Sequence, residues 1–302
     1  MSEAAPVLVV GSVALDTLET PFGRRDDVLG GSASHFALSA RHFAKVRMVA
    51  VVGRDFPAKH VDMFERAGVD LTGLERSDGL TFRWHGKYEG TMSSAQTLET
   101  QLNVLGHFEP KIPPAYRDSR FVLLGKAGAD TQRAVLEQLQ APEFVIMDTM
   151  DLWINTQRRE VWALLPRVHM LCVNYEEALS LAEEPNVVRA SRKLLDAGVP
   201  FVVVKRAEHG STLFTRKFMF SIPAYPTDRV VDPTGAGDAF AGGMLGSLAK
   251  SGLGDGAMKR ALVYGSVMGS LAVESFGTER LEQATAEDVE RRFRALIDMI
   301  SV

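Results

Sequence analysis

The sequence predicts an α/β protein with a central, mostly parallel sheet and a small separate β unit. Continuous apolar runs such as residues 7–10 are typical of strands that are buried on both faces. Beyond residue 114 such runs alternate regularly with helical segments, which is the pattern of parallel βαβ units. A glycine-punctuated stretch of aromatic and β-branched residues interrupts the alternation earlier in the chain. Ligands are therefore expected at the carboxyl ends of the parallel strands.

The composition describes an ordinary soluble globular protein. With 302 residues, the chain could form one large α/β domain or two modest ones. A net charge of −4, without a basic run interleaved with aromatic residues, gives no reason to expect a nucleic-acid partner. No apolar run approaches the ~20 residues that span a bilayer, and residues 1–6 lack the features of a secretory signal. The single cysteine, Cys172, lies in an apolar run, so we expect a buried thiol in a cytoplasmic protein.

The first predicted strand leads to a carboxylate and a glycine pair. The strand spans residues 7–10, and Asp16 follows it on a loop. Gly30 and Gly31 then open a helical stretch that is rich in small residues. Two adjacent glycines allow the backbone to approach a ligand closely, although a turn before a closely packed helix has the same pattern.

A second predicted strand, residues 46–52, ends in a Gly-x-Asp turn and precedes the β-rich excursion. Segment 80–100 contains aromatic and β-branched residues broken by glycines, which indicates short antiparallel strands. Together with residues 12–29, this segment is expected to form a small β lid. Trp84 and Phe82 could stack on a sugar or a base, but packing in a core or an interface is the simpler explanation for each.

The second half of the chain consists of predicted strands, helices and one hairpin. The strands lie at 121–124, 144–147, 170–173 and 201–204, the helices at 132–139, 155–165 and 257–275, and the hairpin at 211–222. An amphipathic helix from about residue 289 ends the chain and is expected to cover the sheet with its apolar face.

The most informative stretch is residues 232–240, Asp-Pro-Thr-Gly-Ala-Gly-Asp-Ala-Phe. Pro233 presets a turn, and Gly235 and Gly237 permit backbone conformations that a Cβ would hinder. A helix that begins here has unpaired N–H groups at its positive end, which bind an anion. Asp238 in the first turn could take a proton from a hydroxyl while these groups hold a phosphoryl group. Taken alone, Gly-x-Gly-Asp also fits a simple helix cap.

The full nine-residue stretch resembles the C-terminal signature of the PfkB (ribokinase-like) carbohydrate kinase family. The resemblance implies one ribokinase-like domain over residues 1–302, built as a three-layer α/β sandwich with a small β lid. In this family the lid often carries dimer contacts. The resemblance also implies an ATP- and magnesium-dependent kinase in which Asp238 is the general base. The backbone of Gly235, Ala236 and Gly237 would form the anion hole.

Other positions resemble the substrate-binding motifs of this family. Gly30 and Gly31 match the N-terminal glycine pair that lines the sugar pocket, and Asp16 matches the carboxylate that binds substrate hydroxyl groups. A carboxylate suits this task because it can accept hydrogen bonds from two neighbouring hydroxyls. His35 stands where the family usually has asparagine.

The nucleotide-binding motifs of the family also have counterparts here. Asn174 and Glu177 resemble its Asn-x-x-Glu motif, in which the glutamate would hold Mg²⁺ through water. The same spacing fits a helix cap with an acidic first turn. Lys205, Ala207 and Gly210 occupy the segment that contacts the nucleotide, where the family commonly has threonine, glycine and glycine.

The turn at residues 276–278 resembles a site where some members of the family bind a monovalent cation such as K⁺. The residue that corresponds to Asp232 contributes to that site.

The acceptor class is left open by these residues. A small sugar with a hydroxymethyl group is narrowly favoured, and a nucleoside is the alternative, because the family contains kinases for both. A non-catalytic sugar- or nucleotide-binding protein is a third hypothesis, against which the presence of Asp238 argues. A nicotinamide-dependent oxidoreductase would need Gly-x-Gly-x-x-Gly after the first strand, and only Gly11 is present; no Walker-type motif occurs either.

Overall fold

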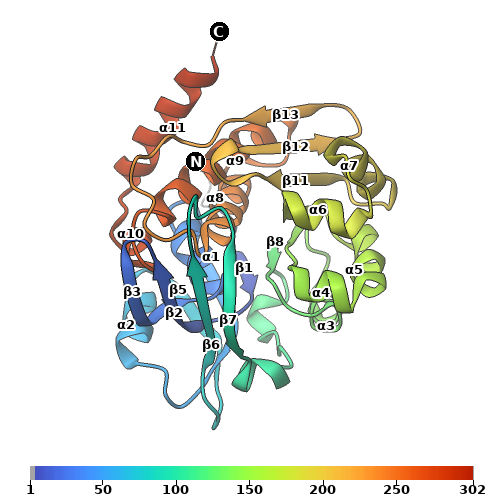
Figure 1. Cartoon of the computed structure of the whole chain (residues 1–302). Coiled ribbons are helices and arrows are strands. Elements are labelled where there is room, and N and C mark those ends of the chain that lie inside the picture. Colours follow the sequence, from blue (N-terminus) through green and yellow to red (C-terminus); the bar gives the residue numbers. More distant parts are fainter. Residues whose placement is uncertain (1–3, 302) are drawn as a thin grey trace.

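The computed structural model describes residues 4–301 (Figure 1). In this part of the chain a nine-stranded sheet has the order β13-β12-β11-β10-β9-β8-β1-β4-β5, and a four-stranded sheet has the order β3-β2-β6-β7. The strands of the large sheet are β1 (Val7–Val10), β4 (Val46–Val52), β5 (Val69–Arg76), β8 (Phe121–Leu124), β9 (Phe144–Met147), β10 (Met170–Asn174), β11 (Phe201–Lys205), β12 (Ser211–Thr215) and β13 (Met219–Ile222).

Neighbouring strands from β5 to β11 are parallel, whereas β12 pairs antiparallel with both β11 and β13. This confirms the prediction of a mostly parallel sheet. Strand β5 was missed because it lacks a continuous apolar run: exposed and half-buried side chains alternate along this edge strand.

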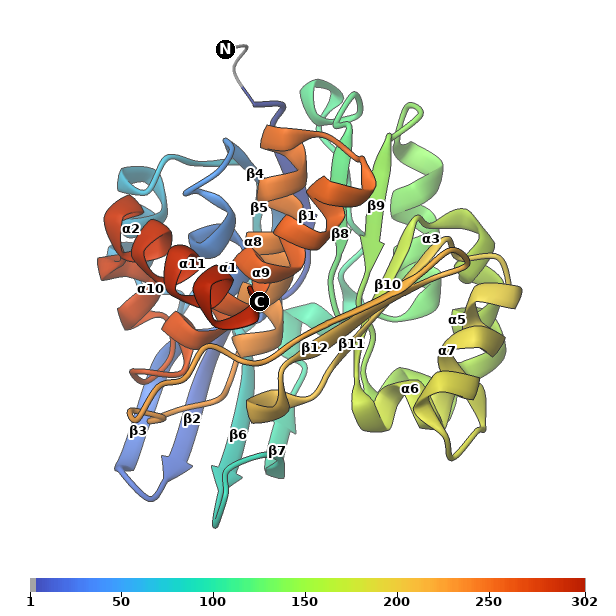
Figure 2. The ribbon, with the colours of Figure 1, turned by 90° about the horizontal axis from the view of Figure 1, so that it is seen from above.

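Helices cover both faces of the large sheet and complete three layers (Figure 2). Side chains of β1 alternate between the two faces, because Val7 and Val9 pack in one core cluster and Leu8 and Val10 in the other. The first cluster lies under α1 (Ser32–Ala40), α2 (Ala58–Arg66), α8 (Ala236–Ser251), α9 (Asp255–Ala272), α10 (Glu279–Gln283) and α11 (Ala286–Ile300). The second lies under α3 (Ala129–Gln138), α4 (Asp151–Thr156), α5 (Arg158–Leu164), α6 (Tyr175–Ala182) and α7 (Val187–Asp196).

Two helical expectations need correction. The segment 155–165, expected as one helix, contains the end of α4 and then α5, because Gln157 leaves the helical conformation with φ −136°. Helix α7 was not predicted, although Asn186 caps it by accepting from the backbone N–H groups of Val188 and Arg189. Within residues 4–301, none of these helices has the length and apolar character needed to cross a membrane.

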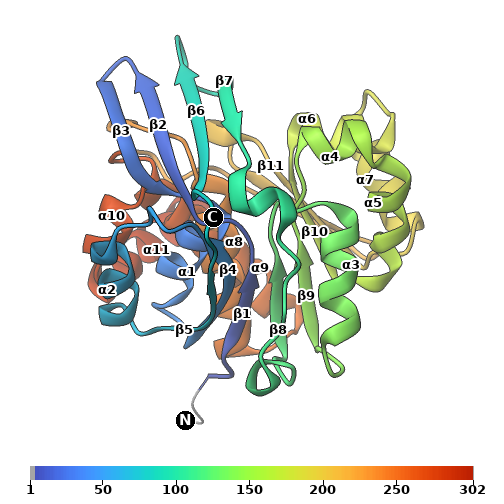
Figure 3. The ribbon, with the colours of Figure 1, turned by 90° about the horizontal axis from the view of Figure 1, so that it is seen from below.

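The small sheet stands at the carboxyl ends of the parallel strands. Its strands are β2 (Ala14–Thr20), β3 (Gly23–Gly30), β6 (Phe82–Tyr88) and β7 (Ala95–Gln101). Figures 2 and 3 show it projecting on the same side as α6, which follows the carboxyl end of β10. Asp16, expected on a loop, lies instead within β2. The position of the sheet fits a cover over the site, and its action as a lid stays a prediction.

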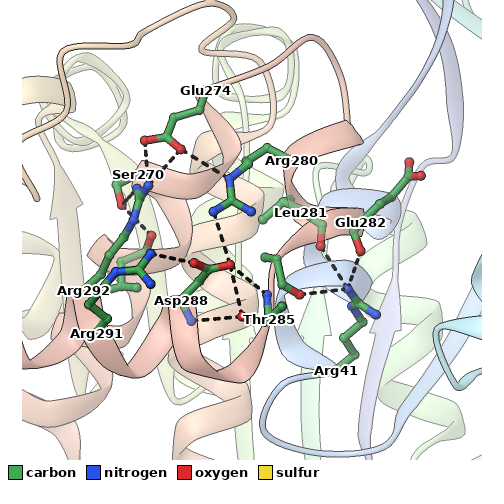
Figure 4. A network of polar contacts seen from close by, with 12 residues as sticks. Arg41, Ser270, Glu274, Arg280, Leu281, Glu282, Thr285, Asp288, Arg291 and Arg292 are labelled. Atoms are coloured by element: carbon green, nitrogen blue, oxygen red, sulfur yellow. Dashed lines mark hydrogen bonds and ion pairs between the residues drawn. The ribbon is translucent and has the colours of Figure 1, made fainter.

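A polar network fixes the segment that follows α9 (Figure 4). Glu274 accepts hydrogen bonds from Arg292 of α11 at 2.7 and 2.8 Å and from Arg280 at 3.4 Å. On the other side, Arg41 donates to the carbonyl groups of Leu281 and Glu282. The turn at residues 276–278 is therefore held between helices from both ends of the chain.

Candidate active site

The signature stretch forms the amino end of α8. Gly235 is the N-cap with φ 75°, a conformation that favours glycine, and Asp238 lies in the first turn as expected. The N–H groups of Gly237 and Asp238 have no acceptor among the described residues, whereas the Ala236 N–H donates to the Pro233 carbonyl at 3.2 Å. The N–H groups of Gly237 and Asp238 are therefore available to bind an anion, whereas the N–H of Ala236 is engaged by the turn itself.

Asp238 is buried, and its two carboxylate oxygens differ. Oδ2 accepts from the Lys126 ammonium group at 3.3 Å, while Oδ1 is buried and has no partner in the described part of the chain. A buried acceptor without a donor is costly unless a ligand supplies one. Oδ1 is thus the oxygen available to receive a proton from an acceptor hydroxyl.

A second lysine, which is half-buried, lies beside the backbone of Gly237. A Cβ on Gly237 would lie 3.0 Å from Lys205 Nζ, and this ammonium group is 3.6 Å from Asp148 Oδ2. Burial alone would lower the pKa of Lys205, but the carboxylate of Asp148 outweighs it and raises the pKa. Lys205 is therefore a permanent positive charge beside the N–H groups that would bind phosphate.

Asn174 and Glu177 form a reciprocal capping box at the start of α6. Asn174 Oδ1 accepts from the Glu177 N–H at 2.8 Å, and Glu177 Oε2 accepts from the Asn174 N–H at 2.7 Å. Burial, together with the charge of Asp148, raises the pKa of Glu177 to about 7. The helix-cap alternative is thus realised, and one oxygen of Glu177 remains for a water-mediated contact.

Asp16 of β2 lies directly over the glycine pair. A Cβ on Gly30 would collide with the Asp16 carboxylate, so glycine is needed there for the two strands to pack. Asp16 Oδ1 is buried and has no partner among the described residues. Burial and the charge of Asp232 raise the pKa of Asp16 from 3.8 to about 8.

This shift predicts a pH-dependent stability. Because the pKa is higher in the folded than in the unfolded chain, the folded protein holds the extra proton between about pH 4 and pH 8. The contribution of Asp16 to the free energy of unfolding is therefore full below pH 4 and is lost as the pH rises to 8. The free energy of unfolding of the wild type, relative to that of Asp16→Asn, should fall by about 2–4 kcal/mol between pH 5 and pH 8. Urea unfolding of both proteins across this range tests the slope, and a constant difference would contradict it.

His35 links the glycine pair to the anion hole. Its Nδ1 is 3.0 Å from the carbonyl oxygen of Gly31, which can only accept, so Nδ1 carries the proton. A Cβ on Gly235 would collide with the imidazole ring. The histidine that replaces the expected asparagine therefore packs against the backbone of the signature turn.

Asp232 and Tyr88 hold the signature turn from two sides. The two oxygens of Asp232 accept from the N–H groups of Thr234 and Gly277, each at 2.9 Å. The Thr234 hydroxyl donates to the phenol oxygen of Tyr88 on β6 at 3.1 Å. The small sheet is thus hydrogen-bonded directly to the signature turn.

The loop after β11 contains two residues with positive φ. Ala207 has φ 46°, at a position where the family commonly has glycine, and Gly210 has φ 84°. A Cβ on Gly210 would collide with the carbonyl of Ile222 on the neighbouring strand β13. The loop keeps the conformation that glycine would favour, at the cost of backbone strain at Ala207.

Sequence reasoning overlooked two residues of this site. Lys126 follows β8 after Gly125, and Asp148 follows β9 directly. Both occupy the carboxyl end of a parallel strand, and this position was the available signal. In residues 4–301 no three His, Cys, Asp or Glu side chains come together as a direct metal-ligand set.

Comparisons with known proteins show the same fold and family. The profile of the pfkB family carbohydrate kinases matches residues 23–284. The chain is 31% identical over 246 residues to a cytidine kinase of Thermococcus kodakarensis, covering 79% of this chain and 87% of the relative. A nucleoside kinase of Burkholderia thailandensis in complex with inosine superposes with a TM-score of 0.81 at 21% identity, covering 97% of this chain and 99% of that one. A protein described as ribokinase II from E. coli, in complex with ATP and Mg²⁺, has a TM-score of 0.79 at 18% identity and covers 96% and 99% of the two chains.

These matches confirm the resemblance on which the sequence interpretation rested. The ribokinase-like fold is shared along nearly the whole chain, and the relatives are named as kinases of sugars and nucleosides. The chain belongs to the pfkB family of carbohydrate kinases and is a phosphotransferase with a sugar or nucleoside alcohol as its acceptor.

Proposed function

We propose that this kinase transfers the γ-phosphoryl group of ATP to the hydroxymethyl group of a nucleoside. The sequence alone narrowly favoured a free sugar. Two of the proteins described above, the cytidine kinase and the inosine complex, bind or act on ribonucleosides, and they move our preference to the alternative. A ribonucleoside presents both a primary hydroxyl for phosphorylation and two neighbouring hydroxyls for Asp16.

The observation that carries this choice is the position of Trp84 on the same face of the small sheet as Asp16. Asp16 and Trp84 are paired in the parallel register of β2 and β6, so their side chains lie on the same face. A Cβ on Gly86 would collide with the Trp84 ring, which therefore lies flat across this glycine. Its indole N–H donates to the Thr97 hydroxyl at 3.2 Å. A fixed, partly exposed indole beside the carboxyl group of Asp16 suits a planar base.

The chemistry follows from the arrangement around Asp238. The acceptor hydroxyl gives its proton to Asp238 Oδ1 as its oxygen attacks the γ-phosphorus, and ADP leaves. The N–H groups of Gly237 and Asp238 stabilise the negative charge of the transferred group. Asp16 orients the acceptor through its other hydroxyls, and closure of the small sheet would exclude water.

Mg²⁺ fits the site as a phosphate-bound, largely hydrated ion. The free oxygen of Glu177 and Oδ2 of Asp148 are the acceptors that its water ligands would meet. Oδ2 of Asp148 accepts no hydrogen bond among residues 4–301, although it lies 3.6 Å from the Lys205 ammonium group. The ion would neutralise charge on the phosphates. Asn174, Lys205, Ala207 and Gly210 remain our candidates for contacts with the nucleotide.

Three further expectations remain proposals. Asp232 is a candidate ligand for K⁺ in addition to its two N–H donors. A homodimer through the small sheet is favoured by β7, whose residues are exposed along its whole length. A cytoplasmic location stays a prediction from composition.

Trp84→Ala tests the choice of acceptor. Loss of base stacking is worth roughly 1–3 kcal/mol, so KM for a nucleoside should rise by about tenfold or more while kcat changes little. The low activity expected on free ribose should not change, because ribose has no base. Steady-state kinetics on cytidine, inosine and ribose measure these values.

Trp162→Ala is the matched control, because Trp162 lies on α5 and contacts Lys193 rather than the small sheet. This control should leave KM and kcat for all three acceptors unchanged. Equal effects of Trp84→Ala on nucleosides and on ribose would contradict the proposed stacking. A wild-type enzyme that prefers ribose would contradict the proposed function itself.

A further inference from the structure

Lys126 lies beside the general base and corresponds to none of the family motifs recognised in the sequence. A Cβ on the preceding Gly125 would lie 2.8 Å from Ser32 Oγ and 3.0 Å from the Val10 carbonyl, so the backbone is closely packed there. The indole N–H of Trp153 donates to the Lys126 carbonyl at 3.3 Å. These contacts fix the backbone from which the side chain extends to the first turn of α8.

The ammonium group of Lys126 is only partly satisfied. Its distance of 3.3 Å to Asp238 Oδ2 exceeds the 2.7–2.9 Å usual for a charge-assisted hydrogen bond. An ammonium group has three donors, and Asp238 is its one hydrogen-bond partner among residues 4–301. The Lys126 side chain is 30% exposed, whereas Asp238 is 7% exposed. Lys126 therefore keeps donors without a partner in residues 4–301, on a side chain that is partly open to a ligand.

The charge of Lys126 is permanent. Burial acts to lower its pKa, but nearby carboxylates outweigh burial and raise it. These carboxylates belong to Asp238, Asp148 and Glu177. Lys126 is thus unsuited to act as a proton donor or acceptor and suited to act as a fixed cation.

The position of Asp238 locates the reacting group. An attacking hydroxyl must lie about 2.6–3.2 Å from the base, and its oxygen about 3–3.5 Å from the phosphorus. The transferred phosphoryl group therefore lies in the immediate surroundings of the Asp238 carboxylate, which Lys126 shares.

We propose that Lys126 is a catalytic residue that binds the oxygens of the phosphoryl group during its transfer. In the absence of nucleotide, its ion pair with Asp238 is a resting position. When ATP binds, the ammonium group turns to the γ-phosphoryl oxygens and leaves the base free for the acceptor. This inference rests on the proposed function, because it uses Asp238 as the base.

Phosphoryl transfer requires no proton from Lys126. The bond between the γ-phosphorus and the bridging oxygen of ADP breaks, and a bond to the acceptor oxygen forms. The hydroxyl proton moves to Asp238, and Lys126 stays protonated throughout. Its contribution is to neutralise charge on the phosphoryl oxygens.

Lys205 provides the comparison. It lies beside Gly237 and pairs with Asp148 at the end of β9, whereas Lys126 pairs with the base itself. We therefore expect Lys205 to contact phosphates that ATP and ADP share and Lys126 to contact the γ-phosphoryl group alone.

Nucleotide binding in the Asp238→Asn background separates a direct contact from an indirect effect on the base. Calorimetry should compare ADP with the non-hydrolysable β,γ-imido analogue of ATP. Adding Lys126→Met should raise the Kd of the analogue by about tenfold or more, which is the value of a charge-assisted hydrogen bond. The Kd of ADP should not change. Adding Lys205→Met should weaken the binding of both nucleotides. Lys250→Met, at the far end of α8, is the control and should leave the binding of both nucleotides unchanged.

Kinetics in the otherwise wild-type chain provide a second test. Lys126→Met should lower kcat by about 10²–10³-fold with little change in KM for the acceptor, and Lys126→Arg should restore part of kcat. Thermal unfolding shows whether each variant is folded.

In the calorimetric comparison, an equal effect of Lys126→Met on the binding of ADP and of the analogue, or no effect on either, would overturn the role of Lys126. Because this binding comparison contains no acceptor, a wrong choice between sugar and nucleoside leaves it intact, whereas failure of the wild type to bind any nucleotide would refute the kinase proposal itself.

Discussion

Asp238→Asn is expected to lower kcat by about 10³-fold while KM for both substrates changes only a few-fold. General base catalysis contributes about 10²–10⁴-fold, and an amide cannot accept the proton. The substitution keeps the shape of the side chain and its hydrogen bond with Lys126, so the first turn of α8 should stay intact. Coupled measurement of ADP release at saturating ATP and acceptor gives kcat directly.

Asp255→Asn is the matched control for this prediction. Asp255 also lies in the first turn of a helix, but this helix is α9, and the side chain is exposed. If Asp238 were merely a helix cap, both variants would reduce stability slightly and leave turnover intact. Retention of more than about a tenth of kcat in Asp238→Asn would contradict its role as the base.

The second large effect is expected from Gly235→Ala. Gly235 has φ 75°, and a Cβ would collide with the ring of His35, which is buried and hydrogen-bonded to Gly31. Either the turn or the histidine must move, and the N–H groups of Gly237 and Asp238 would lose their direction. Removing one donor from an oxyanion site costs about 10²–10³-fold in kcat, and we expect a loss of this size together with a lower melting temperature.

Gly254→Ala is the matched control, because Gly254 is the N-cap of α9. A Cβ at Gly254 meets no atom within 4 Å, and its φ of −72° suits any residue. Gly235→Ala combined with His35→Ala should recover part of the lost stability, since it removes the collision. Normal turnover in Gly235→Ala would show that the geometry of this turn is not needed for catalysis.

The parts of the fold that were predictable have strong local patterns. Residues 144–147 and 170–173 are continuous apolar runs and form β9 and β10 of the parallel sheet. By contrast, β5 at the sheet edge buries only part of its surface, and its pattern is correspondingly weak. The position of Asp16 was misjudged because polar residues at 16, 17 and 19 interrupt the apolar residues of β2.

The candidate site was predictable where its residues lie in one continuous stretch of sequence. Gly235 and Asp238 could be placed because turn and helix are adjacent in sequence. Lys126 and Asp148 could not, because the order of the strands in the sheet determines what faces Asp238, and a single sequence does not contain that order. The replacement of asparagine by His35 was visible, but its packing on Gly235, 200 residues away in the chain, depends on tertiary structure.

The most direct test of the account is the identity of the phosphorylated product. The purified protein should be incubated with magnesium-ATP and cytidine, inosine or ribose, and the products followed by ³¹P NMR. We predict a phosphate ester at the hydroxymethyl group of a nucleoside, formed in equal amount to ADP and faster than any ester of ribose. Faster phosphorylation of ribose, or ADP release without a phosphorylated nucleoside, would contradict the account.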